Sequence, residues 1–241
     1  MNLTAQQYAE LMPDGSLLLS DEPEMDSSLH WSQLELLVSC LEQHWRGRED
    51  YFIGADISVY YSRQQLLHRE LRGPDFFLVK GTERRPRNSW VVWEEQGRYP
   101  DLIIELLSNS TEQVDRTAKK QLYQESFRTP EYFWFHPETL ELAGFRLVDG
   151  VYRPILGDDR DWRYSEQLGL YLGVHDGQLR YFGPDGGLIA TSAETALAEA
   201  RRAQELRAEV EQARAETERE RLRAEALAAR LRSLGIEPGG D

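Results

Sequence analysis

PDLIIELLSNSTEQVDRTAKKQLY, residues 100–123, predicts a buried strand that leads directly into a helix. The apolar run Leu102–Leu107 ends in a polar SNST segment, as a strand does when it enters a turn. A helix is expected from about Thr111 to Glu125, because Ser110 and Gln113 have the spacing of a capping box. The strand also carries acidic residues, and an unpaired carboxylate is costly to bury. This unit therefore guides both the fold class and the search for a site.

The sequence on both sides of this unit predicts a mixed α/β domain over residues 1–185. A helix over residues 28–46 would place four apolar side chains on one face: Leu34, Leu37, Val38 and Leu41. Strand-like runs are expected at Phe52–Tyr61, Phe76–Val79, Trp90–Trp93, Tyr132–Phe135, Leu140–Val148, Tyr152–Ile155 and within residues 169–182. The fold class expected is α/β, with a mixed sheet flanked by helices.

The C-terminal part of the chain has a different composition. After a linker over residues 186–192, residues 193–234 are almost all Ala, Glu, Arg, Leu and Gln and predict one long helix, with a disordered end at 235–241. A heptad seam runs through Leu206, Val210, Ala213, Thr217, Glu220, Ala224, Leu227, Leu231 and Leu234. One interpretation is a coiled coil that assembles a homo-oligomer, such as a dimer. The other is a solitary, salt-bridged surface helix, and the seam slightly favours self-association.

The distribution of charge limits the classes of function. The formal net charge is −14, of which only −2 lies on residues 191–241. Such a charge excludes a tight, passive nucleic-acid coat, because counterion release needs clustered Lys and Arg. No apolar run approaches the roughly 20 residues of a membrane helix, and the N-terminal segment lacks the pattern of a signal peptide. With a single cysteine, Cys40, expected in the core, a cytoplasmic protein that does not bind membranes is predicted.

The acids of the quoted strand indicate a metal site. Side chains alternate along a strand, so Asp101 and Glu105 share a face but lie about 13 Å apart and cannot both bind one ion. Asp75, at the mouth of another short apolar strand, could face the same ion as Glu105 if the two strands are neighbours. Two carboxylates with waters and a substrate phosphate suit Mg²⁺. The alternatives are a turn-forming Pro-Asp at Asp75 and a Glu105 carboxylate paired with an arginine.

Lys119 supplies a third element of this site. Asp115, Lys119 and Tyr123 lie four residues apart, on one side of the helix that follows the strand. The helix could deliver the Lys119 ammonium to the carboxylates, where it would stabilise transition-state charge or orient the attacking water. The alternative is a surface ion pair between Asp115 and Lys119.

One compact basic and aromatic patch is visible in the sequence. Arg84, Arg85 and Arg87 precede Trp90 and could grip a nucleic-acid backbone. A solvated hairpin tip is an equally good interpretation. The five histidines have no zinc-ligand spacing.

Together these residues carry a resemblance to a known family. The order PD…PDLIIELLSNST…DRTAKKQLY…RTPEYFWFHPETLELAGFRL resembles the bacterial Uma-type restriction endonuclease family, which is placed in the PD-(D/E)XK nuclease superfamily. The resemblance extends over most of residues 1–185, including the LTAQQYAELMPDG opening and His30. It implies a restriction-endonuclease-like domain that hydrolyses phosphodiester bonds in nucleic acid with Mg²⁺, for which Mn²⁺ is expected to substitute.

The resemblance also implies roles for individual residues. Asp75 resembles the motif aspartate and Glu105 the acid of the D/E-x-K element, so both would hold the metal. The residue two positions after Glu105 is Leu107, whereas the superfamily has a lysine there. The resemblance implies that Lys119 substitutes for it, and that His30 lies near the site.

Two functional hypotheses follow. The first is a metal-dependent DNA endonuclease whose binding to DNA is weak, because the acidic body repels the duplex unless a metal ion is present. The second is a nuclease-fold scaffold without activity that assembles through the C-terminal coil. The set of Asp75, Glu105 and Lys119 favours the nuclease, because a scaffold has no need of clustered ionisable groups.

Overall fold

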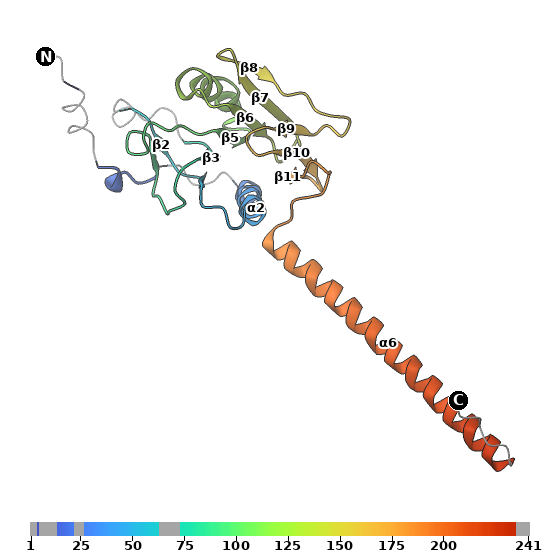
Figure 1. Ribbon diagram of the computed structural model, residues 1–241. Helices are drawn as coiled ribbons and strands as arrows, with labels where there is room; N and C mark the ends of the chain where they lie inside the picture. Colours follow the sequence, from blue (N-terminus) through green and yellow to red (C-terminus); the bar gives the residue numbers. More distant parts are fainter. Residues whose placement is uncertain (1–3, 5–13, 22–26, 63–72, 235–241) are drawn as a thin grey trace. The chain divides into compact units, whose positions relative to one another are not determined.

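A computed structural model describes residues 4, 14–21, 27–62 and 73–234. The chain divides into two compact units, Met1–Thr191 and Ser192–Asp241. The first unit is a mixed α/β body, and the second is built on the single long helix α6, Ser192–Ser233 (Figure 1). The predicted disordered end at 235–241 and most of the LTAQQYAELMPDG opening lie outside the described residues.

The body is organised around a mixed sheet, as the sequence predicts. Six described strands pair in the order β1-β3-β5-β6-β7-β8. Their bounds are β1 Tyr51–Ala55, β3 Phe76–Lys80, β5 Leu102–Leu106, β6 Glu131–Phe135, β7 Leu142–Val148 and β8 Val151–Pro154. Within this sheet β5 and β6 pair in parallel and the other neighbours are antiparallel. A parallel pair needs a crossover connection, and here a helical segment supplies it.

Two smaller sheets complete the described strands of the body. β9 Arg163–Ser165, β10 Leu170–His175 and β11 Gln178–Phe182 form an antiparallel sheet, and β2 Val59–Tyr60 pairs in parallel with β4 Trp90–Val91. The single strand predicted over Phe52–Tyr61 is wrong, because the chain breaks into β1 and β2. Asp56 lies between them with φ of 52°, in the left-handed region that no strand residue adopts.

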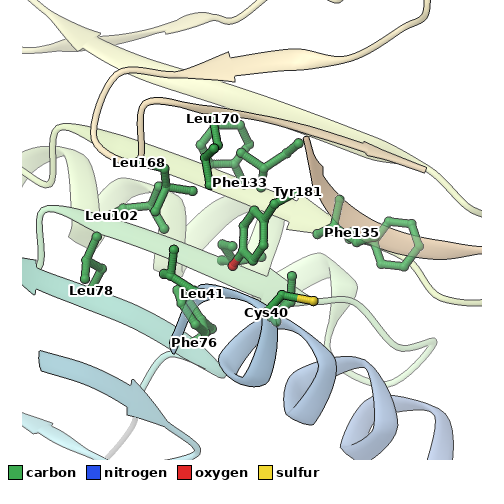
Figure 2. Packing of buried hydrophobic residues seen from close by; sticks show 14 of the residues in the cluster. Cys40, Leu41, Phe76, Leu78, Leu102, Phe133, Phe135, Leu168, Leu170 and Tyr181 are labelled. Atoms are coloured by element: carbon green, nitrogen blue, oxygen red, sulfur yellow. The ribbon is translucent and has the colours of Figure 1, made fainter. Parts of the chain in front are cut away.

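Helix α2, Ser28–His44, covers one face of the central sheet. Its N-terminus is capped by Ser27, whose side chain accepts a hydrogen bond from the His30 backbone N–H. Figure 2 shows side chains of α2, of the central strands and of the β10–β11 hairpin meeting in one apolar cluster. The predicted core position of Cys40 is confirmed, because its side chain is buried in this cluster.

A helical segment over residues 112–127 packs against the opposite face. It runs as α4 Glu112–Val114, a π-helical turn Asp115–Lys119, α5 Lys120–Leu122 and a second π-helical turn Tyr123–Phe127. Tyr123 and Phe127 pack with Ile103 and Leu107, whose side chains point away from α2. The predicted cap at Ser110 is wrong: the N-cap residue is Thr111, and its backbone N–H donates to Ser108 Oγ. π-helical turns are uncommon and occur often at functional sites.

The C-terminal helix carries polar residues on all sides. No side chain within Ser192–Ser233 is buried, and Arg221 forms ion pairs with Glu218 and Glu225. A helix of this kind either stands alone with many ion pairs or packs against a partner, so self-association stays a prediction. In the chain that precedes it, the Ile189 N–H donates to Tyr181 O, which ties part of the predicted linker to β11.

No helix in the described part of the chain is long and apolar enough to span a membrane.

Candidate active site

The pairing of β3 with β5 brings Asp75 and Glu105 together. Phe76 pairs with Ile104 in an antiparallel register, so the residue before the first stands opposite the residue after the second. The Asp75 N–H donates to Glu105 Oε2 at 3.4 Å, and the Leu106 N–H donates to Asp75 Oδ2 at 2.6 Å. Glu105 is fully buried, whereas Asp75 is partly exposed. The two carboxylates are therefore neighbours, and solvent reaches them from the Asp75 side.

The helical segment delivers Lys119 to the same place. Its Nζ atom lies 3.1 Å from Glu105 Oε2 and 3.0 Å from Asp115 Oδ1. The Asp115 side chain is 1% exposed and that of Lys119 is 12% exposed. The interpretation of Asp115 and Lys119 as a surface ion pair is therefore wrong, and within the described residues the cation paired with Glu105 is this lysine and not an arginine.

Tyr123 completes the surroundings of Glu105. Its hydroxyl donates to Glu105 Oε1 at 2.7 Å, so each oxygen of this carboxylate has a partner. Burial raises the pKa of Tyr123 well above its ordinary value, which keeps the phenol protonated as a donor. The sequence pattern placed Asp115 and Tyr123 on the side of the helix that carries Lys119, but it assigned neither of them to the site. Their spacing of four residues around Lys119 was the signal.

Burial and like charge shift the pKa values of the cluster. Burial raises the pKa of Glu105 well above its ordinary value; the Lys119 ammonium opposes this shift, and the carboxylates of Asp75 and Asp115 add to it. Burial likewise raises the pKa of Asp75. Burial disfavours the charge on Lys119, but the three carboxylates around it outweigh that effect and raise its pKa. Lys119 therefore stays positively charged. Among the described residues, its ammonium is the cation that three carboxylates share.

This charge imbalance fits a divalent cation. If all three carboxylates are ionised, the Lys119 ammonium leaves this group of described side chains with an excess of two negative charges. Among the described residues, no group of three or more His, Cys, Asp and Glu side chains is arranged to hold a metal ion. The donor set that fits is the Asp75–Glu105 pair, which suits an ion such as Mg²⁺ that retains several waters.

The predicted arginine patch lies elsewhere. Arg84, Arg85 and Arg87 follow the end of β3, whereas Asp75 precedes its start, so the sheet separates the patch from the carboxylates. Arg84 pairs with Glu42 at 2.8 Å, and Arg85 pairs with Glu95 at 2.7 Å.

Arg87 is part of the packing of the body. Its side chain is 3% exposed, pairs with Glu95 at 2.6 Å and lies over the rings of Phe52 and Trp90. Arg87 therefore fits neither predicted interpretation. It is not part of a solvent-exposed hairpin tip, and its guanidinium is not exposed to bind a nucleic-acid backbone. The sequence did not indicate that Glu95 would accept two arginines.

His30 lies beside the site, as the resemblance implies. Its Nε2 donates to Leu106 O at 3.0 Å, and its Nδ1 is 3.0 Å from Ser27 Oγ. A carbonyl oxygen only accepts, so the ring proton is on Nε2, and Nδ1 accepts from the Ser27 hydroxyl. The Leu106 N–H donates to Asp75 and the Leu106 carbonyl oxygen accepts from His30, so both polar backbone groups of Leu106 are bound by residues at the site.

Comparisons with known proteins identify the family of this chain. No curated protein matches the chain. A crystal structure described as a "putative nuclease belonging to DUF820" from Anabaena variabilis ATCC 29413 is similar at 12% sequence identity and a TM-score of 0.45. The similarity covers 69% of this chain and 91% of that one. Residues 4–179 match the model of the Uma2 family, described as "Putative restriction endonuclease", and because this match covers most of the chain, the protein belongs to that family.

Proposed function

We propose that the protein is a Mg²⁺-dependent endonuclease that hydrolyses phosphodiester bonds in DNA. The observation that carries the proposal is the cluster in which three carboxylates surround one lysine, where β3 begins and β5 ends. Buried ionisable groups with shifted pKa values concentrate at functional sites. Membership of the Uma2 family supports the reaction class.

Asp75 and Glu105 would hold the metal ion. The Leu106 N–H fixes Asp75 Oδ2, while Tyr123 and Lys119 fix the two oxygens of Glu105, so the donors are positioned before an ion arrives. When bound, Mg²⁺ or Mn²⁺ would polarise the phosphoryl group and lower the pKa of a coordinated water. A substrate phosphate would approach the ion from the partly exposed Asp75 side.

Lys119 would stabilise the negative charge that develops on the phosphoryl oxygens or orient the attacking water. Its ammonium is held between Glu105 and Asp115, so little reorganisation is needed during the reaction. Here the lysine comes from the helical segment, because Leu107 of the strand is buried against Tyr123 and Phe127.

Binding to DNA would be weak and would depend on the metal. The body carries most of the formal charge of −14. The three clustered arginines, Arg84, Arg85 and Arg87, are already paired with glutamates. Long-range attraction to a phosphate backbone is therefore small, and a divalent ion at the site would supply local attraction.

A second candidate function is a scaffold that has the nuclease fold but no activity. The observation that favours it is the exposure of Leu206, Val210 and Leu227 along α6, which a partner helix would cover. In this alternative a homo-oligomer assembled through α6 carries the function, and the buried cluster contributes only to folding.

The test is a cleavage assay on the full-length protein. Supercoiled plasmid, single-stranded DNA and RNA are incubated with Mg²⁺, with Mn²⁺ or with EDTA, and Glu105→Ala is assayed in parallel. The proposal expects cleavage that requires metal and is lost in the variant. Cleavage that persists in Glu105→Ala would contradict the assignment, and absence of cleavage by the wild type with every substrate would favour the scaffold.

Removal of α6 separates the two candidates further. A chain ending at Thr191 is compared with the full chain by sedimentation. The scaffold hypothesis expects the mass per particle to fall to that of one chain, whereas an unchanged oligomeric state shows that α6 is not the assembly element.

A further inference from the structure

A second site lies beside the carboxylate cluster, at the end of β5. A cavity of about 260 Å³ opens where the chain leaves the strand, and its walls include Leu107, Ser108, Ser110, His30 and His136. This space is large enough for a small polar group and a few waters, but smaller than most pockets for drug-sized ligands. We call it the serine–histidine pocket. None of the groups proposed for the hydrolytic reaction lines it.

Two helical N-termini converge on this pocket. The first belongs to α2, whose cap residue Ser27 and first-turn residue Leu29 are part of the wall. The second belongs to the helical segment 112–127, which is preceded by Ser108–Ser110. The N–H groups of His30 and Thr111 at these ends already donate to Ser27 and Ser108, and the helix dipole places partial positive charge there. Both ends therefore favour an anion in the space between them.

His136 contributes a buried donor to the same wall. It is 4% exposed, and its Nδ1 accepts hydrogen bonds from the backbone N–H groups of Glu138 and Thr139 at 3.2 and 3.4 Å. A nitrogen that accepts carries no proton, so the ring proton of the neutral imidazole is on Nε2. Among the described residues Nε2 of His136 has no hydrogen-bond partner. Because His136 lines the pocket, this N–H is available to an acceptor that binds there.

The hydroxyl groups add donors suited to a tetrahedral anion. Ser108 Oγ lies 2.8 Å from Ser110 Oγ and 3.0 Å from Thr111 Oγ1, so the hydroxyls form a chain along the pocket wall. Hydroxyl hydrogens rotate toward an acceptor that binds beside them. Glu138 also lines the pocket and is exposed at its rim, where its charge opposes an anion.

We propose that the serine–histidine pocket binds a phosphate group, and that this phosphate belongs to the nucleic-acid strand, next to the one that is hydrolysed. The second part rests on the proposed function. Leu107 directly follows β5 and lies two residues after Glu105, about 7 Å along the chain if it stays extended. A strand whose phosphate sits in the pocket would therefore present a neighbouring phosphodiester to the Asp75–Glu105 pair. The pocket positions substrate and takes no part in the chemical step.

The test uses inorganic phosphate and the full-length protein in EDTA. Amide and imidazole NMR signals are followed during titration with phosphate and, at equal ionic strength, with chloride. We expect saturable shifts at Asn109, Ser110 and His136 with phosphate alone. His136→Asn retains a side-chain acceptor for the turn and loses the Nε2 donor, so its affinity should fall about tenfold.

Two further variants check the direction of the effect. Glu138→Gln removes the opposing carboxylate and should strengthen binding about threefold. His175→Asn changes an exposed histidine on β10 and should leave the affinity unchanged. Equal phosphate affinity in His136→Asn and the wild type, or no saturable shift with phosphate, would overturn the proposal that the pocket binds phosphate.

A competition experiment identifies the source of the phosphate. A short single-stranded oligonucleotide should displace inorganic phosphate from the pocket, and failure to do so would overturn the assignment to a nucleic-acid strand. Glu105→Gln should bind phosphate as the wild type does. Persistent cleavage by that variant would count against the proposed active site and would leave the phosphate titration as an independent result.

Discussion

Two glutamates on neighbouring strands are both fully buried, yet their surroundings differ. Glu131 of β6 receives an ion pair from Arg146 at 2.9 Å, a hydrogen bond from Ser165 Oγ, and two backbone N–H groups. Glu105 of β5 has one lysine, which it shares with Asp115 and which lies close to Asp75. Glu131 has more donors than it needs, whereas Glu105 shares with two other carboxylates the one cation that the described residues place there.

The difference teaches that burial of a carboxylate does not by itself indicate function. Glu131 ties β6 to the turn after β9, and its charge is balanced where it stands. Glu105 sits in a cluster with an excess of negative charge, and its pKa is raised well above the ordinary value. A folded protein tolerates such an imbalance where a cation or substrate corrects it. The predictions below exploit this contrast.

Removal of the Lys119 ammonium should have the largest effect on stability. Lys119→Met leaves Glu105, Asp115 and Asp75 without an ammonium and should lower the free energy of unfolding by about 4 kcal/mol at pH 8. The loss should be smaller at pH 5, because the pKa values of Glu105 and Asp75 are already raised by burial, rise further without the ammonium, and protonation of these two groups then favours the fold. Urea unfolding at the two pH values measures this. An equal loss at both would contradict the charge imbalance.

The same substitution on the two strands should give unequal results. Glu131→Gln weakens a balanced ion pair and should lower the free energy of unfolding by about 2 kcal/mol. Glu105→Gln removes repulsion with Asp75 and leaves Lys119 paired with Asp115, so the change should be less than about 1 kcal/mol. Urea unfolding at pH 7 compares them. A larger loss in Glu105→Gln than in Glu131→Gln would reverse our interpretation of the two sites.

The pH dependence should carry the signature of Glu105. A carboxyl group whose pKa is raised on folding contributes stability that is fully present below its unfolded pKa and is lost as pH rises through the folded pKa. Above about pH 4, the wild type should therefore lose stability relative to Glu105→Gln, by at most about 1.4 kcal/mol per pH unit. Lys119 stays charged over this range. Parallel pH curves for the two proteins would show that Glu105 is not shifted.

Removal of the Tyr123 hydroxyl should have a small effect on stability. Tyr123→Phe deletes the hydrogen bond to Glu105 Oε1 and should cost about 1 kcal/mol. Because that bond favours the ionised carboxylate, the pKa of Glu105 should rise further, and the apparent affinity for Mg²⁺ at pH 6 should fall more than at pH 8. Titration calorimetry at both pH values tests this, with Tyr152→Phe on β8 as a matched buried tyrosine whose affinity should not change.

Much of the candidate site follows from the sequence because strand pairing and helix spacing are local rules. Alternation along Leu102–Leu107 placed Glu105 on one face with Ile103 and Leu107, and the spacing of four residues placed Lys119 with Asp115; the structure adds that this face lies opposite α2. The adjacency of Asp75 required one assumption, that β3 and β5 are neighbours, and their register is as that assumption needs.

The parts that could not be predicted depend on contacts between distant segments. Arg85 and Arg87 read as open cations because nothing local shows that both pair with Glu95. Glu131 was overlooked, because its partners come from β7 and the turn after β9. The break at Asp56 reflects a left-handed backbone angle that tertiary contacts impose. Local pattern therefore found the charged cluster, and only the fold distinguished it from balanced ion pairs.

The most direct test of the central claim compares DNA cleavage by Glu105→Gln and Glu131→Gln. Both variants replace a fully buried glutamate on adjacent strands by an amide of nearly the same size, so each removes one buried carboxylate without leaving a cavity. Initial rates are measured with saturating Mg²⁺ at a temperature where both proteins are folded. The account predicts that Glu105→Gln loses at least about a hundredfold in rate, whereas Glu131→Gln stays within about threefold of the wild type. Equal rates for the two variants would contradict it.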